Sequence, residues 1–75
     1  MTREEAFERL TNVFREVFDD DSIEIFDATV ADDIEDWDSF EHINLIVAVE
    51  EEFGFKIPMG KAVTMKNVGE MVDII

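Results

Sequence analysis

The sequence predicts an all-α fold: a small four-helix bundle with three longer helices, one short third helix and a long first loop. Its 75 residues are enough for one modest core, so we expect residues 1–75 to form a single domain. Apolar residues make up 47% of the chain, and most recur at the three- and four-residue spacing of amphipathic helices. Cysteine is absent, which excludes a disulfide framework and a thiolate metal site.

The first helix is expected to follow Thr2, because Thr2 and Glu5 have the spacing of a capping box. Its polar face carries three of the six basic residues, so this helix is close to charge-balanced. The acidic run at residues 19–22 ends it. The apolar face repeats every three or four residues and comprises Phe7, Leu10, Val13, Phe14, Val17 and Phe18.

A stretch without sustained helical periodicity continues to Trp37. Loops of this length are unusual in compact domains, so we expect apolar side chains to pin it against the bundle. These are Ile23, Ile25, Phe26, Val30, Ile34 and Trp37. Thr29 is positioned to cap a short helical turn at residues 31–34. The acidic residues do not form an EF-hand, since the sixth position counted from Asp19 is Glu24 rather than glycine; weak divalent-cation binding stays open.

The second helix is predicted over residues 39–53. Either Asp38 or Ser39 can cap it, and with Asp38 as the cap, Glu41 has capping-box spacing. At roughly 100° per residue, one face is predicted to be core and contains Leu45, Ile46, Val49 and Phe53. A second apolar stripe, flanked by Asn44 and Glu51, comprises Phe40, Ile43 and Val47. One buried face cannot use both stripes, so we expect Val47 to be partly exposed.

The remaining elements follow from local signals. Gly54 is expected to end the second helix in a left-handed conformation. Residues 55–58 are extended, because the residue before a proline avoids the helical region. Residues 59–63 form the short third helix. Asn67 together with Glu70 caps the last helix, whose inward face comprises Val68, Met71, Val72 and Ile75.

The chain is strongly acidic, with a formal net charge of −14 from 20 acidic and 6 basic residues. Such a charge repels nucleic acids and anionic membrane surfaces, so we expect neither as a partner, and it attracts basic protein surfaces. No apolar run approaches the length of a membrane span, and no signal peptide opens the chain. We therefore expect a cytoplasmic monomer without membrane insertion.

An enzyme is not predicted. His42, the only histidine, follows Ser39 by three residues, but a nucleophilic serine also needs a base oriented by a third group and donors for an oxyanion. The glycines of a nucleophile elbow are missing. Packing at the edge of the bundle is the favoured role for His42, and lining the mouth of a cargo cavity is the alternative. Trp37 is expected to anchor the loop by burying its ring.

The segment Asp38-Ser39-Phe40, followed at residues 43–53 by Ile-Asn-Leu-Ile-Val-Ala-Val-Glu-Glu-Glu-Phe, resembles the acyl carrier protein superfamily. The resemblance covers essentially the whole chain, so the expected domain is acyl-carrier-like. Trp37 stands where many carriers have a small residue, and Phe40 replaces the usual leucine. In these respects the chain looks more like free-standing carriers of specialised pathways, or D-alanyl carriers, than a housekeeping fatty-acid carrier.

The resemblance implies that Ser39 carries 4′-phosphopantetheine, on which acyl or aminoacyl intermediates are tethered as thioesters for fatty-acid, polyketide, lipid or related biosynthesis. It implies as partners a phosphopantetheinyl transferase, loading enzymes, and downstream synthases or transferases with basic surfaces. No catalytic residue and no metal site are implied. The expected recognition residues are Asp38, Phe40, Glu41, Ile43, Val47 and Glu51. The alternative is an acidic protein-interaction adaptor without a prosthetic group.

Overall fold

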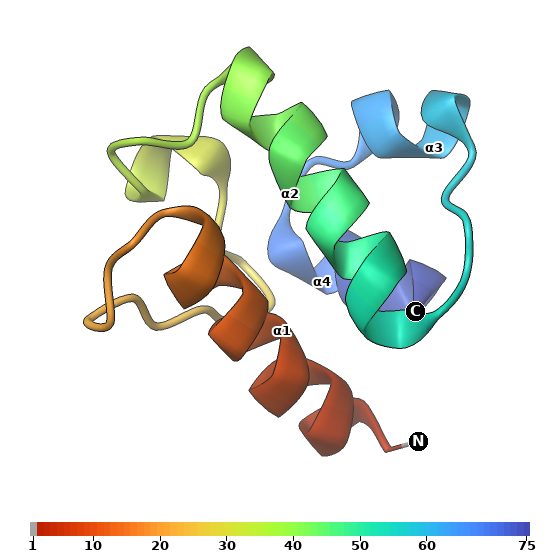
Figure 1. Cartoon of the computed structure of the whole chain (residues 1–75), viewed down its shortest axis with the longest axis horizontal. Helices are drawn as coiled ribbons and strands as arrows, with labels where there is room; N and C mark the ends of the chain where they lie inside the picture. The colour runs from red at the N-terminus through yellow and green to blue at the C-terminus, as the bar shows by residue number, and fades with distance from the viewer. Residues whose placement is uncertain (1) are drawn as a thin grey trace.

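The computed structural model describes residues 2–75 and contains no strand within them. Four α-helices and one 3₁₀ turn make up the fold (Figure 1), which confirms the all-α prediction. The elements, in chain order, are α1 (Arg3–Val17), η1 (Ala31–Asp33), α2 (Ser39–Phe53), α3 (Met59–Thr64) and α4 (Val68–Ile74).

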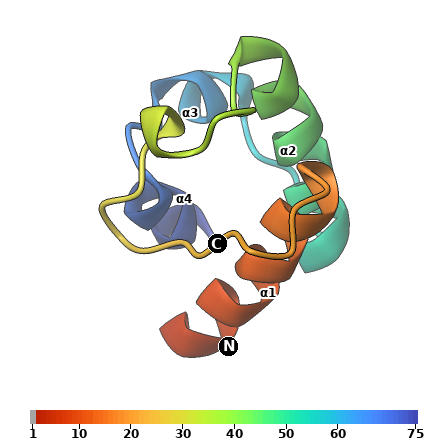
Figure 2. The same cartoon turned by 90° about the vertical axis from the view of Figure 1, so that its left-hand side faces the viewer.

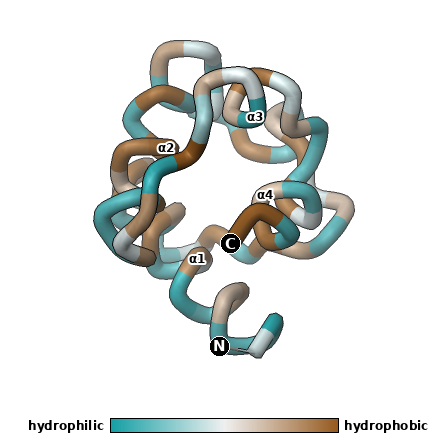
Figure 3. The backbone as a smooth tube through the Cα atoms, turned by 90° about the vertical axis from the view of Figure 1, so that its right-hand side faces the viewer, coloured by the Kyte–Doolittle hydropathy of each residue, from teal (hydrophilic) through white to brown (hydrophobic). Residues whose placement is uncertain are grey.

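Helices α1 and α2 pack along each other in opposite directions, and α4 also contacts α1 (Figures 1 and 2). Polar and apolar stretches alternate along the helical tubes in Figure 3, which is the amphipathic pattern that buries one face of each helix. The largest fully buried side chains are Leu10, Phe14, Leu45, Val49, Val68 and Met71. These residues come from α1, α2 and α4, so one core joins the three longer helices.

The predicted helix ends are confirmed. The Thr2 hydroxyl accepts a hydrogen bond from the backbone N–H of Glu5 at 3.1 Å. The Asn67 side chain accepts one from the backbone N–H of Glu70 at 2.9 Å. Gly54 ends α2 with φ at 73°, a left-handed conformation that glycine adopts without steric cost. Local side-chain chemistry therefore fixes where these helices begin and end.

The first loop is held by fewer side chains than predicted. Ile23 and Ile25 are buried, but Phe26 is 64% exposed, so its predicted burial is wrong. Successive side chains of an extended segment point to opposite sides, and Phe26 follows the buried Ile25. Thr29 does not cap η1 either. It is 7% exposed, and its hydroxyl accepts a hydrogen bond from the Phe26 backbone N–H at 2.8 Å, while Val30 precedes η1.

The turn after α1 is stabilised by its own polar groups. Asp19 adopts a positive φ of 50°, which aspartate tolerates better than most residues. The Ser22 hydroxyl and backbone N–H both donate to the Asp20 carboxylate, at 2.6 and 2.9 Å. These bonds lower the pKa of Asp20. A lowered folded-state pKa contributes stability above the unfolded-state value, and this stability is lost as the pH falls through the folded-state pKa.

All three arginines are used inside the fold. Arg3 pairs with Asp27 in the first loop and with Asp73 on α4, and these hydrogen bonds raise its pKa, with Asp27 the larger cause. Arg9 on α1 bonds the Glu52 carboxylate on α2 at 2.7 Å. The third, at position 15, donates to the Ile23 carbonyl at 2.9 Å. The lysines form no ion pair within residues 2–75, so most of the acidic surplus is not locally neutralised.

We expect the chain to be more stable at high salt. Screening weakens repulsion among the surplus carboxylates, and at about 1 M salt the Debye length is only about 3 Å. High salt also weakens the ion pairs of Arg3 and Arg9, but this loss of stability is small. The side chains of these pairs are 39–66% exposed, and exposed pairs contribute about 0–1 kcal/mol. Circular dichroism should show a Tm higher by about 4–8 °C in about 1 M sodium chloride, equivalent to about 1 kcal/mol. An unchanged Tm would show that the repulsion is already offset locally.

Gly69 is required where α4 meets the first loop. Its N–H donates to the Asp27 carbonyl at 2.9 Å, and a Cβ at this position would lie 2.9 Å from that same oxygen. We expect Gly69→Ala to lower the free energy of unfolding by about 1–2 kcal/mol. The added methyl group would overpack this contact, which costs about 1–3 kcal/mol of stability. Alanine has a higher helix propensity than glycine, but this gain is at most about 1 kcal/mol.

The matched control for Gly69→Ala is Gly60→Ala, on α3. A Cβ added to Gly60 meets no atom within 4 Å, so only the propensity gain should operate and the free energy of unfolding should rise. Urea unfolding of both variants measures the difference. If both substitutions stabilise the fold equally, the close contact with the loop is not a constraint.

Candidate functional site

Ser39 is the first residue of α2, and its side chain is exposed. Asp38, not Ser39, is the N-cap: its carboxylate accepts a hydrogen bond from the Glu41 backbone N–H at 2.8 Å. The Glu41 carboxylate accepts from the Asn44 side chain at 3.3 Å. No residue in the described range, 2–75, forms a hydrogen bond with the Ser39 hydroxyl. Capping by Asp38 therefore leaves this hydroxyl unengaged at a helix N-terminus, where backbone N–H groups and the dipole favour negative charge.

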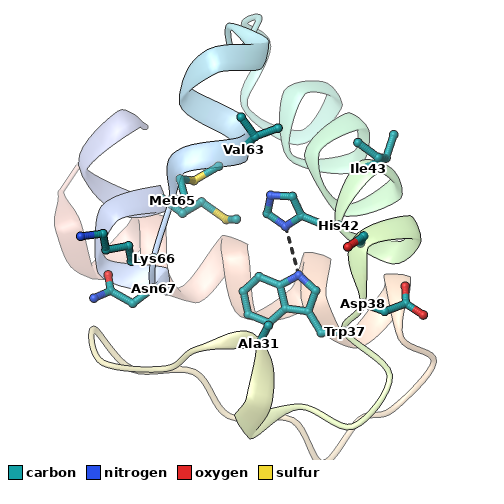
Figure 4. Close-up of a pocket in the computed structure, with 11 residues that line it drawn as sticks. Ala31, Trp37, Asp38, His42, Ile43, Val63, Met65, Lys66 and Asn67 are labelled. Atoms are coloured by element: carbon teal, nitrogen blue, oxygen red, sulfur yellow. Dashed lines mark hydrogen bonds between the residues drawn. The ribbon is translucent and has the colours of Figure 1, made fainter.

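A pocket of about 460 Å³ opens beside Ser39 (Figure 4). Its walls come from η1, the end of the first loop, the start of α2, the end of α3, the α3–α4 connection and α4. The lining residues are Ala31, Trp37, Asp38, Ser39, His42, Ile43, Val63, Met65, Lys66, Asn67 and Met71. A group attached to the Ser39 side chain would therefore stand at the edge of a largely apolar pocket.

Trp37 and His42 meet in the wall of this pocket (Figure 4). The indole N–H of Trp37 donates to His42 Nδ1 at 3.1 Å. That bond requires an acceptor at Nδ1, so the proton of neutral His42 is assigned to Nε2, which donates to the Ala62 carbonyl at 2.8 Å. Both ring nitrogens are thus engaged away from Ser39, and His42 does not form a base–nucleophile pair with it. His42 is half-buried and packs against Trp37, as favoured from the sequence, and it also lines the pocket, which was the alternative role.

The second apolar stripe of α2 lies at the surface, as predicted. Phe40, Ile43 and Val47 are 75%, 47% and 48% exposed. The carboxylates beside the stripe divide into two groups. Those of Glu50 and Glu52 serve the fold, by accepting the Ile57 N–H at 2.7 Å and by pairing with Arg9. Those of Glu41 and Glu51 form no ion pair with any described residue and so are available for contacts with a partner.

The structure brings Asp38, Ser39 and Ile43 together at the pocket, whereas Phe40, Val47 and Glu51 extend along the exposed side of α2. Sequence reasoning did not identify the opposite wall, formed by Val63, Met65, Lys66 and Asn67. The only sequence signal that could have indicated this wall is the apolar pair Met59 and Val63, which lie four residues apart on a short helix. Nothing in that spacing shows that the helix faces Ser39.

No group of three or more His, Cys, Asp or Glu side chains within 2–75 is arranged to hold a metal ion. None of the helices in that range is long and apolar enough to cross a membrane.

Comparisons with known proteins agree with this geometry. Residues 8–75 match the family model described as "Phosphopantetheine attachment site". The chain is 34% identical to the acyl carrier protein of Lactobacillus johnsonii, over 100% of this chain and 94% of that protein. It is 31% identical to the mitochondrial acyl carrier protein of Saccharomyces cerevisiae, over 100% of this chain and 63% of that protein. The solution NMR structure of holo acyl carrier protein from Geobacter metallireducens superimposes with a TM-score of 0.84 at 46% identity, covering 91% of this chain and 78% of that one.

The match to a phosphopantetheine attachment site, in an all-helical bundle with an exposed serine at a helix start, defines the class of this protein as a non-catalytic carrier domain. The match over residues 8–75, together with the relatives, identifies the family of carrier domains to which the chain belongs. The chain belongs to the acyl carrier protein family, whose prosthetic group is covalently attached phosphopantetheine.

Proposed function

We propose that Ser39 carries 4′-phosphopantetheine and that the chain tethers acyl or aminoacyl intermediates on it as thioesters. The observation that carries this proposal is the exposed Ser39 hydroxyl, without a hydrogen-bond partner in the described chain, at the start of α2. When bound, the group supplies a thiol that a chain without cysteine lacks. The residues around Ser39 fit it: the helix N-terminus favours the phosphodiester, and the adjacent pocket accepts the cargo.

Partner enzymes are proposed to bind along α2. The contact surface would consist of the exposed apolar stripe and the carboxylates beside it that form no ion pair: Asp38, Phe40, Glu41, Ile43, Val47 and Glu51. Aromatic and aliphatic anchors supply most of the affinity of an interface, and surrounding charges steer association. The net charge of −14 favours a transferase, loading enzymes and synthases with basic surfaces. Trp37 and Phe40 favour a specialised fatty-acid, polyketide, lipid or related pathway.

The test is loading of the purified protein. The chain is incubated with coenzyme A, magnesium and a broad-specificity phosphopantetheinyl transferase, and the product is analysed by intact and fragment mass spectrometry. We expect one added phosphopantetheine on the fragment that contains Ser39. Modification of Ser22, the other serine, contradicts the assignment. No modification with several transferases favours the acidic adaptor without a prosthetic group.

Asp38→Asn separates two roles of the residue before Ser39. Asparagine caps helices about as well as aspartate, so α2 should keep its start, but the exposed carboxylate that we assign to the transferase and its magnesium ion is lost. Hydrogen bonds to charged groups contribute about 1.5–3 kcal/mol, so we expect loading to be at least about tenfold slower with little change in Tm. Asp36→Asn, on the same loop and not a cap, is the control. Loading of Asp38→Asn at the unmodified rate would limit Asp38 to capping.

A further inference from the structure

We propose that Trp37 and His42 form a floor that limits how deeply cargo enters the pocket, so that the pocket selects short apolar acyl groups. This inference rests on the proposed attachment of cargo to Ser39. The inference concerns the choice of cargo. Trp37 and His42, which would make this choice, neither attach the prosthetic group nor belong to the α2 contact surface.

Trp37 both lines the pocket and contacts two aromatic rings of the core. Trp37 lines the pocket, whereas Phe14 and Phe18 do not. Both phenylalanines contact Trp37: the Phe14 ring meets it edge-on at 5.2 Å between centroids, and the Phe18 ring lies at 6.4 Å. Phe14 is completely buried. Cargo that enters from Ser39 therefore reaches the indole before it reaches Phe14 and Phe18, and passage toward these two rings requires the indole to move.

His42 holds the indole in this position. The two rings are nearly parallel, with an interplanar angle of 19° and centroids 5.9 Å apart. The Trp37 N–H is bonded to His42, and His42 is bonded to the carbonyl of Ala62, which is itself 2% exposed. The chain of bonds links the first loop, α2 and α3 across the pocket. Swinging the indole aside would leave polar groups without partners in a partly buried site, which is unfavourable.

The lining favours apolar cargo over polar cargo. Ala31, Ile43, Val63, Met65 and Met71 supply its apolar surface. The polar atoms of the floor are already paired with each other or with backbone, and no buried side-chain nitrogen or oxygen among the described residues lacks a partner. A polar cargo would lose water at the floor without gaining a hydrogen bond. The volume of about 460 Å³ lies toward the small end of the range of about 300–1,000 Å³ for ligand pockets.

The experiment loads Ser39 with butanoyl, octanoyl, dodecanoyl or palmitoyl groups, transferred with phosphopantetheine from the corresponding acyl-coenzyme A. Intact mass confirms each product, and circular dichroism gives its Tm. We expect Tm to rise from butanoyl to octanoyl, by at most about 3–6 °C for each methylene that leaves water, and to rise no further with the longer chains. Trp37 is the only tryptophan, so its emission should change over the same range and then stay constant.

Trp37→Leu removes most of the floor, so dodecanoyl and palmitoyl groups should raise its Tm beyond the octanoyl value. Each Tm is compared with that of the unacylated holo form of the same variant, which separates the effect from the lower stability of the variant. His42→Ala, which releases the indole, serves as a second test should Trp37→Leu fail to fold. Phe26→Leu is the control, because Phe26 is an exposed aromatic residue of the same loop that does not line the pocket.

A Tm that keeps rising to palmitoyl in the unmodified protein overturns the proposal. The proposal is also overturned if the Tm of both Trp37→Leu and His42→Ala still stops rising after octanoyl. Failure of the proposed attachment is distinguishable from either result, because the acyl group would then be missing from the intact mass before any melting curve is measured.

Discussion

Replacing Ser39 with alanine should abolish loading by a phosphopantetheinyl transferase without unfolding the protein. The hydroxyl that we propose as the nucleophile is lost, and the hydroxyl of the other serine, Ser22, is already bonded to the Asp20 carboxylate. The fold should be little affected. Ser39 is exposed, and the cap of α2 is supplied by Asp38, so the free energy of unfolding should change by no more than about 0.5 kcal/mol. Intact mass spectrometry and urea unfolding measure the two effects.

Ser22→Ala is the matched control for Ser39→Ala. Ser22 is also exposed, but its hydroxyl is occupied by the Asp20 carboxylate. We expect this variant to load at the unmodified rate. If Ser39→Ala still accepts one phosphopantetheine while Ser22→Ala does not, the attachment site has been assigned to the wrong serine.

Ile46→Ala should destabilise the protein strongly, whereas Val47→Ala, at the next position of α2, should not. Ile46 is 7% exposed and belongs to the core, while Val47 is 48% exposed. Truncating a buried isoleucine costs about 2–5 kcal/mol, and truncating an exposed side chain usually changes stability by about 0.5 kcal/mol or less. Urea midpoints of the two variants provide the comparison. Equal destabilisation would place both side chains in the core.

Val47→Glu tests the proposed contact surface at the same position. The substitution places a charge within the exposed apolar stripe, where anchor residues contribute more to binding than the charged rim does. We expect slower loading by the cognate enzyme at an almost unchanged Tm. Glu51→Gln, which alters only the rim, should reduce the rate less. Loading of Val47→Glu at the unmodified rate would mean that partners bind elsewhere.

Local signals in the sequence predict the helices and the candidate attachment residue. Capping by Thr2 and Asn67 and the left-handed Gly54 involve groups within a few residues of one another, so their effects can be predicted locally. For α2 the sequence left both Asp38 and Ser39 as possible caps, and the structure shows that Asp38 is the cap. Apolar spacing then assigned Ile46 and Val47 to different stripes of the same helix, since neighbouring residues are about 100° apart around its axis. The position of Ser39 at the start of α2 follows from the same local chemistry.

The pocket, the bonds of His42 and the path of the first loop depend on tertiary packing. Helical spacing cannot show which distant element covers a side chain, so the pocket remained unidentified: it joins η1, α2, α3 and α4 across long sequence separations. The bond between His42 and Ala62 spans 20 residues, and its role appears only when α3 lies over the start of α2. In the irregular first loop, composition suggested that Phe26 was buried and that Thr29 was a cap. The path of the backbone, which no helical or strand period describes there, turned Phe26 outward and buried Thr29.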